Sequence, residues 1–173
     1  MSRGARFLGG IGFILSGVTD VSILSVVGAM VAVYTYPLGI LFRGFGWILL
    51  SRRMRVGLYM VTGILVIILG LIFYVSILGE LELIERRVMG AGLIPPVILW
   101  SVYSGIEATS YKGLTGYSGA FKLSLISILG IIIILPSFLM ILLTGEVWEY
   151  WLIGMVPLAV SAFSAAAGFI RLG

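Results

Sequence analysis

Long apolar runs with almost no charge recur along the chain and constrain its fold more than any other feature. Of the 173 residues, 61% are hydrophobic and 10% are charged. Soluble domains carry about 25% charged residues, so this chain cannot cover itself with a water-facing surface. The run IIIIL at residues 131–135 does not alternate apolar and polar side chains, as the strands of a membrane barrel do. The sequence therefore predicts an all-α, polytopic transmembrane helical bundle in a multi-pass membrane protein.

The number of spans depends on residues 6–50, which could hold one long span or two short ones. With two spans and Asp20 at the outer turn, nine of the 11 Lys and Arg residues lie on one side. The positive-inside rule favours this arrangement, since five spans would place the arginines of residues 43–55 opposite those at the N-terminus. We predict six spans in three consecutive hairpins, with both termini cytoplasmic, in one integral-membrane domain (1–173). The predicted spans are residues 6–20, 21–42, 56–77, 92–112, 117–143 and 147–170.

Three glycines in the first span form a candidate helix-packing face: Gly9, Gly10 and Gly12. Glycines permit close approach of two helix backbones in a membrane. The face could pack against helices of the same chain, which we favour, or dock another subunit.

An arginine cluster follows an aromatic and apolar stretch between the second and third predicted spans: Arg52, Arg53 and Arg55. We predict that this stretch lies at the headgroup boundary, with the arginines on anionic lipid. Determination of topology alone is a sufficient alternative explanation for the cluster.

One set of polar and aromatic side chains occurs within a predicted span. Helical spacing places five side chains on one face of the fourth span: Trp100, Tyr103, Ser104, Glu107 and Tyr111. Lys122 of the fifth span lies at a depth similar to that of Glu107, so we predict a structural ion pair between these two. A substrate or proton site is the alternative. The other five spans have no ionisable group near the bilayer centre if their charges lie at the interfaces.

The composition excludes several kinds of chemistry. The chain has no cysteine or histidine, so it has no disulfide, thiolate or ordinary zinc site, and haem or copper would lack common ligands. No phosphate-binding loop or nucleophile–base motif is present. The net charge of +4 does not indicate nucleic acid, because Lys and Arg set orientation in membrane proteins. We predict no cofactor, no metal site, no nucleic-acid partner and no enzyme activity.

Two short motifs resemble an archaeal integral-membrane family of unknown function. The first is Leu-Gly-Gly-Ile-Gly at residues 8–12 of the N-terminal hairpin, and the second is Thr115-Gly116 before the penultimate span. Residues 42–92 match this family only in hydropathy. The resemblance implies an archaeal cytoplasmic membrane and brings no assigned activity.

Glycine-rich packing faces, minimal loops and the absence of catalytic motifs predict a small accessory or scaffold subunit of a larger membrane complex. Its partners would be membrane lipids and other integral membrane subunits. The alternative is a small-solute or ion channel or transporter. We expect that a transporter of this kind would work as a homo-oligomer, because one six-helix chain would need other copies to form a polar lumen.

Overall fold

The structure is a computed structural model that describes residues 3–85, 94–144 and 150–172, and these are almost entirely helical, with no strand. Ser25 caps the helix that begins at Val26, since its Oγ accepts a 3.0 Å hydrogen bond from the Gly28 N–H. The helices run in chain order as α1 (Arg3–Ser22), α2 (Val26–Met54), α3 (Gly57–Glu85), α4 (Ile94–Leu114), α5 (Ala120–Ser124), α6 (Ser127–Thr144) and α7 (Tyr150–Arg171).

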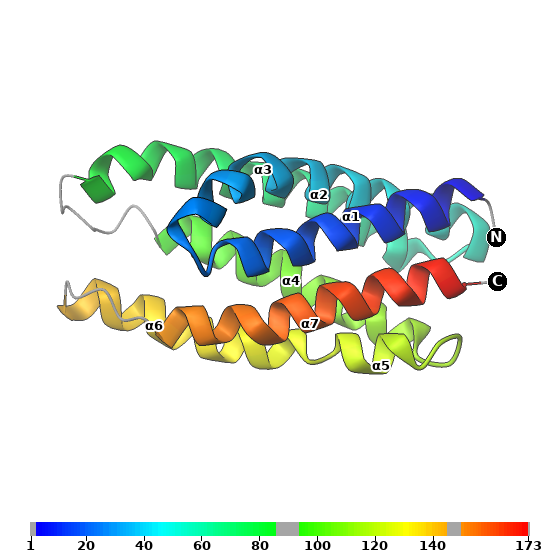
Figure 1. The fold of residues 1–173 in the computed structure, drawn as a ribbon. Coiled ribbons are helices and arrows are strands. Elements are labelled where there is room, and N and C mark those ends of the chain that lie inside the picture. Colours follow the sequence, from blue (N-terminus) through cyan, green and yellow to red (C-terminus); the bar gives the residue numbers. More distant parts are fainter. Residues whose placement is uncertain (1–2, 86–93, 145–149, 173) are drawn as a thin grey trace.

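The six long helices pack side by side as a closed ring (Figure 1). Each packs against the next in the chain, from α1 through α4 to α6 and α7, and α7 returns to pack against α1. The short helix α5 packs against α7 and α4. The residues that face the inside of this ring are therefore contributed by helices far apart in the sequence.

Four segments are long and apolar enough to cross a membrane, which indicates a membrane protein. They are Met30–Met54, Gly57–Gly79, Ala120–Ser137 and Leu152–Arg171. Among the described residues, α1 and α4 are not long and apolar enough to be counted as candidate spans by the same criteria. Both carry charged and hydroxyl side chains, and several of these line the interior of the ring, among them Ser16, Asp20, Ser104 and Glu107.

The structure differs from the predicted spans at three places. The predicted third span ends at residue 77, whereas α3 continues to Glu85. The predicted second span ends at residue 42 and an interfacial segment follows, whereas α2 continues through this segment to Met54. Arg43 consequently lies in the middle of a long helix. The predicted fifth span, 117–143, is divided into α5 and α6 by a turn at Leu125 and Ile126.

Most cations gather at the end of the ring where both termini lie (Figure 1). The first turn of α1, the ends of α2, α4 and α7, and α5 together supply Arg3, Arg6, Arg52, Arg53, Arg55, Lys112, Lys122 and Arg171. This set includes the predicted lipid and topology cluster and omits only Arg43 of the nine predicted inner cations. Arg86 and Arg87, predicted on the outer side, lie outside the described residues. We call this end the cationic end.

The three glycines of the predicted packing face are buried within the chain. A Cβ atom on Gly12 would collide with the backbone of Arg43 in α2, and one on Gly9 would collide with the Phe169 ring in α7. A Cβ on Gly10 would lie 3.0 Å from Ile170 Cγ1. These glycines therefore pack α1 closely against its own neighbours rather than forming an exposed face for another subunit.

Candidate functional site

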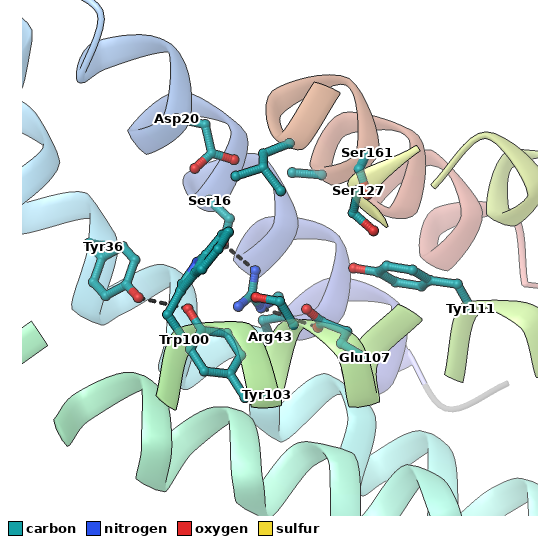
Figure 2. A pocket seen from close by; sticks show the side chains of 13 residues that line it. Ser16, Asp20, Tyr36, Arg43, Trp100, Tyr103, Glu107, Tyr111, Ser127 and Ser161 are labelled. Carbon is teal, nitrogen blue, oxygen red and sulfur yellow. Dashed lines mark hydrogen bonds and ion pairs between the residues drawn. The ribbon is translucent and has the colours of Figure 1, made fainter. Parts of the chain in front are cut away.

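A polar pocket of about 50 Å³ lies inside the ring. Figure 2 shows its side chains converging from α1, α2, α4, α6 and α7. A water molecule needs about 10–15 Å³ by this measure, so the pocket has room for about three to five waters. Its lining residues are Ser16, Asp20, Tyr36, Arg43, Trp100, Tyr103, Ser104, Glu107, Tyr111, Ser127, Leu158, Ser161 and Ala162.

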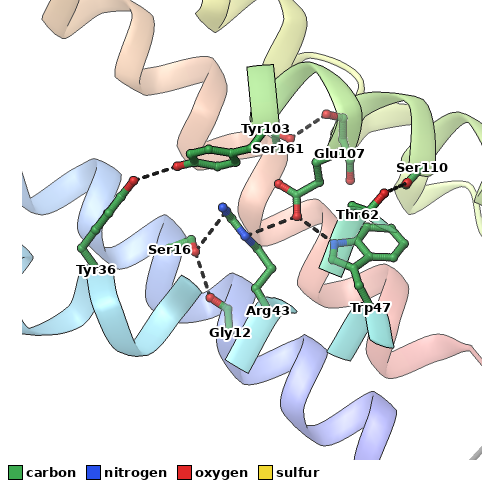
Figure 3. A network of polar contacts seen from close by, with 11 residues as sticks. Gly12, Ser16, Tyr36, Arg43, Trp47, Thr62, Tyr103, Glu107, Ser110 and Ser161 are labelled. Atoms are coloured by element: carbon green, nitrogen blue, oxygen red, sulfur yellow. Dashed lines mark hydrogen bonds and ion pairs between the residues drawn. The ribbon is translucent and has the colours of Figure 1, made fainter. Parts of the chain in front are cut away.

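An ion pair between α2 and α4 forms the centre of the site. Arg43 Nε lies 3.3 Å from Glu107 Oε1, and the two side chains are only 11% and 5% exposed. The Trp47 Nε1–H donates a 2.8 Å hydrogen bond to the same carboxylate oxygen (Figure 3). A buried carboxylate is costly unless it is paired and hydrogen-bonded, and Glu107 has both kinds of partner.

The guanidinium group of Arg43 is held from several directions. Its Nη1 donates to Ser16 Oγ at 3.2 Å, and Ser16 Oγ in turn donates to the Gly12 carbonyl oxygen at 3.0 Å. The group lies 5.5 Å from the centre of the Phe13 ring and 5.8 Å from that of Tyr103. These distances allow cation–π attraction to both rings. The cation is thus fixed in place, with guanidinium N–H groups left over to face the pocket.

Two other polar groups of the pocket have no such partners. Asp20, in the last turn of α1, forms no hydrogen bond and no ion pair to any other described residue. Ser127, in the first turn of α6, is 7% exposed, and its Oγ has no hydrogen-bond partner in the described part of the chain. Buried polar groups are nearly always satisfied, so the unpartnered hydroxyl of Ser127 indicates that something else fills the pocket beside it. Asp20 is partly buried.

Aromatic side chains close the pocket toward the cationic end. The rings of Phe13, Trp47, Tyr111, Phe121 and Phe169 are all at most 3% exposed and contact one another. Phe13, Trp47 and Phe169 lie nearer the cationic end of their helices than the polar pocket residues that the same helices supply. Tyr111 lines the pocket itself, and Phe121 belongs to α5 at the cationic end. We call these five residues the aromatic plug. The aromatic plug thus places packed rings between the pocket and the cationic end.

The opposite side of the pocket is closed more lightly. The hydroxyl groups of Tyr36 and Tyr103 form a 2.7 Å hydrogen bond between α2 and α4 (Figure 3). The turn between α1 and α2 lies well short of the end that α3 and α6 reach (Figure 1). Asp20 lies two residues before the end of α1, so it is set back inside the ring from the end that α3 and α6 reach.

The structure confirms that the five polar and aromatic residues predicted on one face of α4 lie together. All five line the pocket, namely Trp100, Tyr103, Ser104, Glu107 and Tyr111. The predicted partner of Glu107 requires correction. Lys122 is exposed on α5, and the ion pair that Glu107 makes joins it to Arg43. Depth along a hairpin was the only basis for Lys122, and depth does not fix the direction in which a side chain points.

Two charged residues of the site were assigned elsewhere by the sequence. Arg43 was placed at the inner interface, because a charge in a span was assumed to mark its end. The spacing of Ile40, Arg43, Trp47 and Leu50 could have corrected this, since it follows one buried helical face through Arg43. Asp20 was placed at the outer turn, but that turn comprises Ile23 to Ser25, and Asp20 lies within α1.

The arrangement can bind and hold small polar species, but it has no recognisable catalytic set. The described residues contain no group of three or more acidic, histidine or cysteine side chains that could hold a metal ion in the usual way. No protein family, curated protein or solved structure matches the chain. The pocket itself is therefore the basis for any functional proposal.

Proposed function

We propose that the protein is a membrane carrier for a small ion or small polar solute, which binds in the central pocket. The observation that carries this proposal is the ion pair of Arg43 and Glu107, together with the unpartnered Asp20, inside an apolar ring of helices. Ionisable groups within a bundle are expensive, and they commonly mark substrate or ion pathways.

The carrier mechanism is alternating access about the pocket. The packed rings of the aromatic plug lie between the pocket and the cationic end, which argues for a carrier rather than an open channel. In the proposed cycle, the solute enters past the Tyr36–Tyr103 hydrogen bond and leaves after the helices shift around the plug. The pocket is formed by one chain, so this mechanism does not need the homo-oligomer that the sequence suggested.

The proposal includes six spans in a cytoplasmic membrane, with the cationic end inside the cell. Helices α1 and α4 complete the ring and cross the membrane despite their polar residues, because these face the pocket rather than lipid. The positive-inside rule supports the orientation, since eight cations gather at the end where the termini lie.

The accessory-subunit prediction depended on glycine-rich packing faces, minimal loops and the absence of catalytic motifs. Gly9, Gly10 and Gly12 are buried against the same chain, and the ring contains a charged pocket. Membership of a larger complex stays a prediction from the sequence.

Flux through proteoliposomes tests the proposal. The purified chain would be reconstituted and assayed for uptake of radioactive sodium, potassium and chloride, and for permeation of urea and glycerol by light scattering. We expect protein-dependent flux of at least one probe, with a loss of at least about tenfold in Glu107→Gln. Lys122→Gln is the matched control, because it also replaces a charged group by an amide but lies outside the pocket.

Two results would contradict a carrier. One is the absence of protein-dependent flux for every probe with a correctly folded chain. The other is equal flux in the wild type and in Glu107→Gln. If the first result came with stoichiometric co-purification of another membrane protein, the accessory-subunit prediction would be preferred.

A further inference from the structure

We infer that the pocket binds one monovalent metal cation at the carboxylate of Asp20, with Ser127 supplying a hydroxyl ligand. The inference rests on the proposed function and specifies its substrate class. It starts from the charges of the pocket lining, which comprise two carboxylates and one guanidinium group. The Arg43–Glu107 pair is neutral as a unit, so Asp20 leaves one negative charge in excess. Asp20 is partly buried within the ring. An uncompensated charge that is partly removed from water is unfavourable, and one bound monovalent cation compensates it.

The position of Asp20 on its helix favours a cation for a second reason. The last turn of α1 contains Asp20 and has no basic residue. The carbonyl groups at the C-terminal end of a helix carry a partial negative charge, which attracts cations. Membrane carriers place the C-terminal ends of helices beside the sodium ions that they bind. In α1 the carbonyl groups of Thr19, Val21 and Ser22 already accept backbone hydrogen bonds, so the helix end acts through its partial charge. The negative charge of the Asp20 carboxylate and the partial negative charge of the helix end thus both attract a cation.

Ser127 provides an independent observation that points to a ligand. Its side chain is buried and its Oγ has no partner in the described residues, yet it lines the same pocket as Asp20. Figure 2 shows its hydroxyl directed toward the interior between α6 and α4. A hydroxyl oxygen is a hard ligand suited to alkali and alkaline-earth cations, as a carboxylate is.

The size and charge of the pocket restrict the occupant. The cavity of about 50 Å³ accommodates an ion with two or three waters. A divalent cation would leave the lining with one positive charge in excess, beside the guanidinium group of Arg43. A monovalent ion such as Na⁺ leaves the pocket neutral.

The experiment measures sodium binding to the full-length chain in detergent, in alkaline buffer with choline chloride holding the ionic strength constant. We expect saturable binding of radioactive sodium with one site per chain, and a rise of several degrees in the unfolding temperature. Magnesium chloride at matched ionic strength should give no comparable shift. Asp20→Asn should abolish sodium binding and remove the sodium-dependent shift.

A pair of serine variants keeps the test decisive if Asp20→Asn does not fold. Ser127→Ala should weaken sodium binding by about five- to tenfold, since it removes one polar ligand. Ser101→Ala is the matched control and should bind sodium as the wild type does. The Ser101 hydroxyl donates to the Val97 carbonyl oxygen of its own helix and does not line the pocket.

The absence of sodium binding to the folded wild type would overturn the inference, as would wild-type affinity in both Asp20→Asn and Ser127→Ala. The flux assay separates this failure from that of the carrier. Flux of another probe without sodium binding refutes the cation site and leaves the carrier standing. Sodium binding at Asp20 without any flux supports the cation site and refutes the carrier.

Discussion

Arg43 Nε of α2 and Glu107 Oε1 of α4 lie 3.3 Å apart inside the ring of helices, and this ion pair joins two helices that are not neighbours in the ring. The contact is ionic rather than an aligned hydrogen bond, because the Nε–H does not point well at the carboxylate oxygen. Trp47 supplies the aligned hydrogen bond to that oxygen. The pair therefore depends on the indole group for its geometry and on Arg43 for its charge balance.

We expect strong energetic coupling between these two residues. Arg43→Gln and Glu107→Gln should each lower the free energy of unfolding in detergent by up to about 3–5 kcal/mol, because each leaves the other charge buried and unpaired. The double variant should lose less than the sum of the two single losses, by at least about 1 kcal/mol. Thermal or denaturant unfolding of the four proteins gives the coupling energy.

The control for this cycle pairs Glu107→Gln with Lys122→Gln. Lys122 is exposed and makes no ion pair with Glu107, so these two losses should add to within about 0.5 kcal/mol. Coupling to Lys122 together with additivity for Arg43 would restore the pairing that the sequence predicted.

The hydrogen bond from Trp47 should stabilise the charged form of Glu107. Trp47→Phe removes the 2.8 Å donor, and a hydrogen bond to a charged group contributes about 1.5–3 kcal/mol. The same substitution in a Glu107→Gln background removes only a neutral hydrogen bond, worth about 0.5–1.5 kcal/mol. Unfolding measurements should therefore show a loss smaller by about 1 kcal/mol in that background. An equal loss in both backgrounds would mean that Trp47 acts only through its packing.

The sequence predicted the fold class, because apolar runs leave a chain few alternatives to membrane helices. It also predicted the polar face of α4, because five side chains at helical spacing share one face if the segment is an α-helix. The end of α4 at Leu114 lies close to the predicted end at residue 112, whereas α2 and α3 run well beyond the predicted ends at residues 42 and 77, to Met54 and Glu85.

The site could not be assembled from the sequence, because its charges come from three different helices. The prediction placed Arg43 and Asp20 at interfaces on the assumption that charges avoid the interior. A charge can lie inside a ring of helices when another helix supplies its partner, and the order of helices in space decides which one. The sequence could not show that α2 presents Arg43 to Glu107 rather than to lipid headgroups.

Close packing between α1 and α2 should be sensitive to one added methyl group at Gly12. A Cβ there would meet the backbone of Arg43, which cannot move aside as a flexible side chain can. Gly12→Ala should lower the free energy of unfolding by about 1–3 kcal/mol. Thermal unfolding in detergent measures the loss, and sodium binding should weaken with it because Arg43 shifts.

Gly105→Ala is the matched control for this substitution. Gly105 lies within α4, and its added Cβ would meet nothing within 4 Å. Removing the backbone freedom of a helical glycine there should raise stability by about 0.5–1 kcal/mol. A gain at both positions would show that α1 and α2 are less tightly packed than the structure has them.

The six-span arrangement places the turn after α1 and the turn after α4 on opposite sides of the membrane. The chain has no native cysteine, so single cysteines at Leu24 and Gly116 can be labelled with an impermeant maleimide without further changes. Leu24 is 43% exposed in the first turn, and Gly116 is exposed at the cationic end. We expect Leu24→Cys to label in intact cells and Gly116→Cys to label only after lysis, because the cationic end faces the cytoplasm. Both should label in detergent.

If residues 6–50 formed one long span, Leu24→Cys would lie in the hydrocarbon and stay unlabelled until detergent is added. Labelling of both cysteines from one side would contradict the six-span ring and its orientation together.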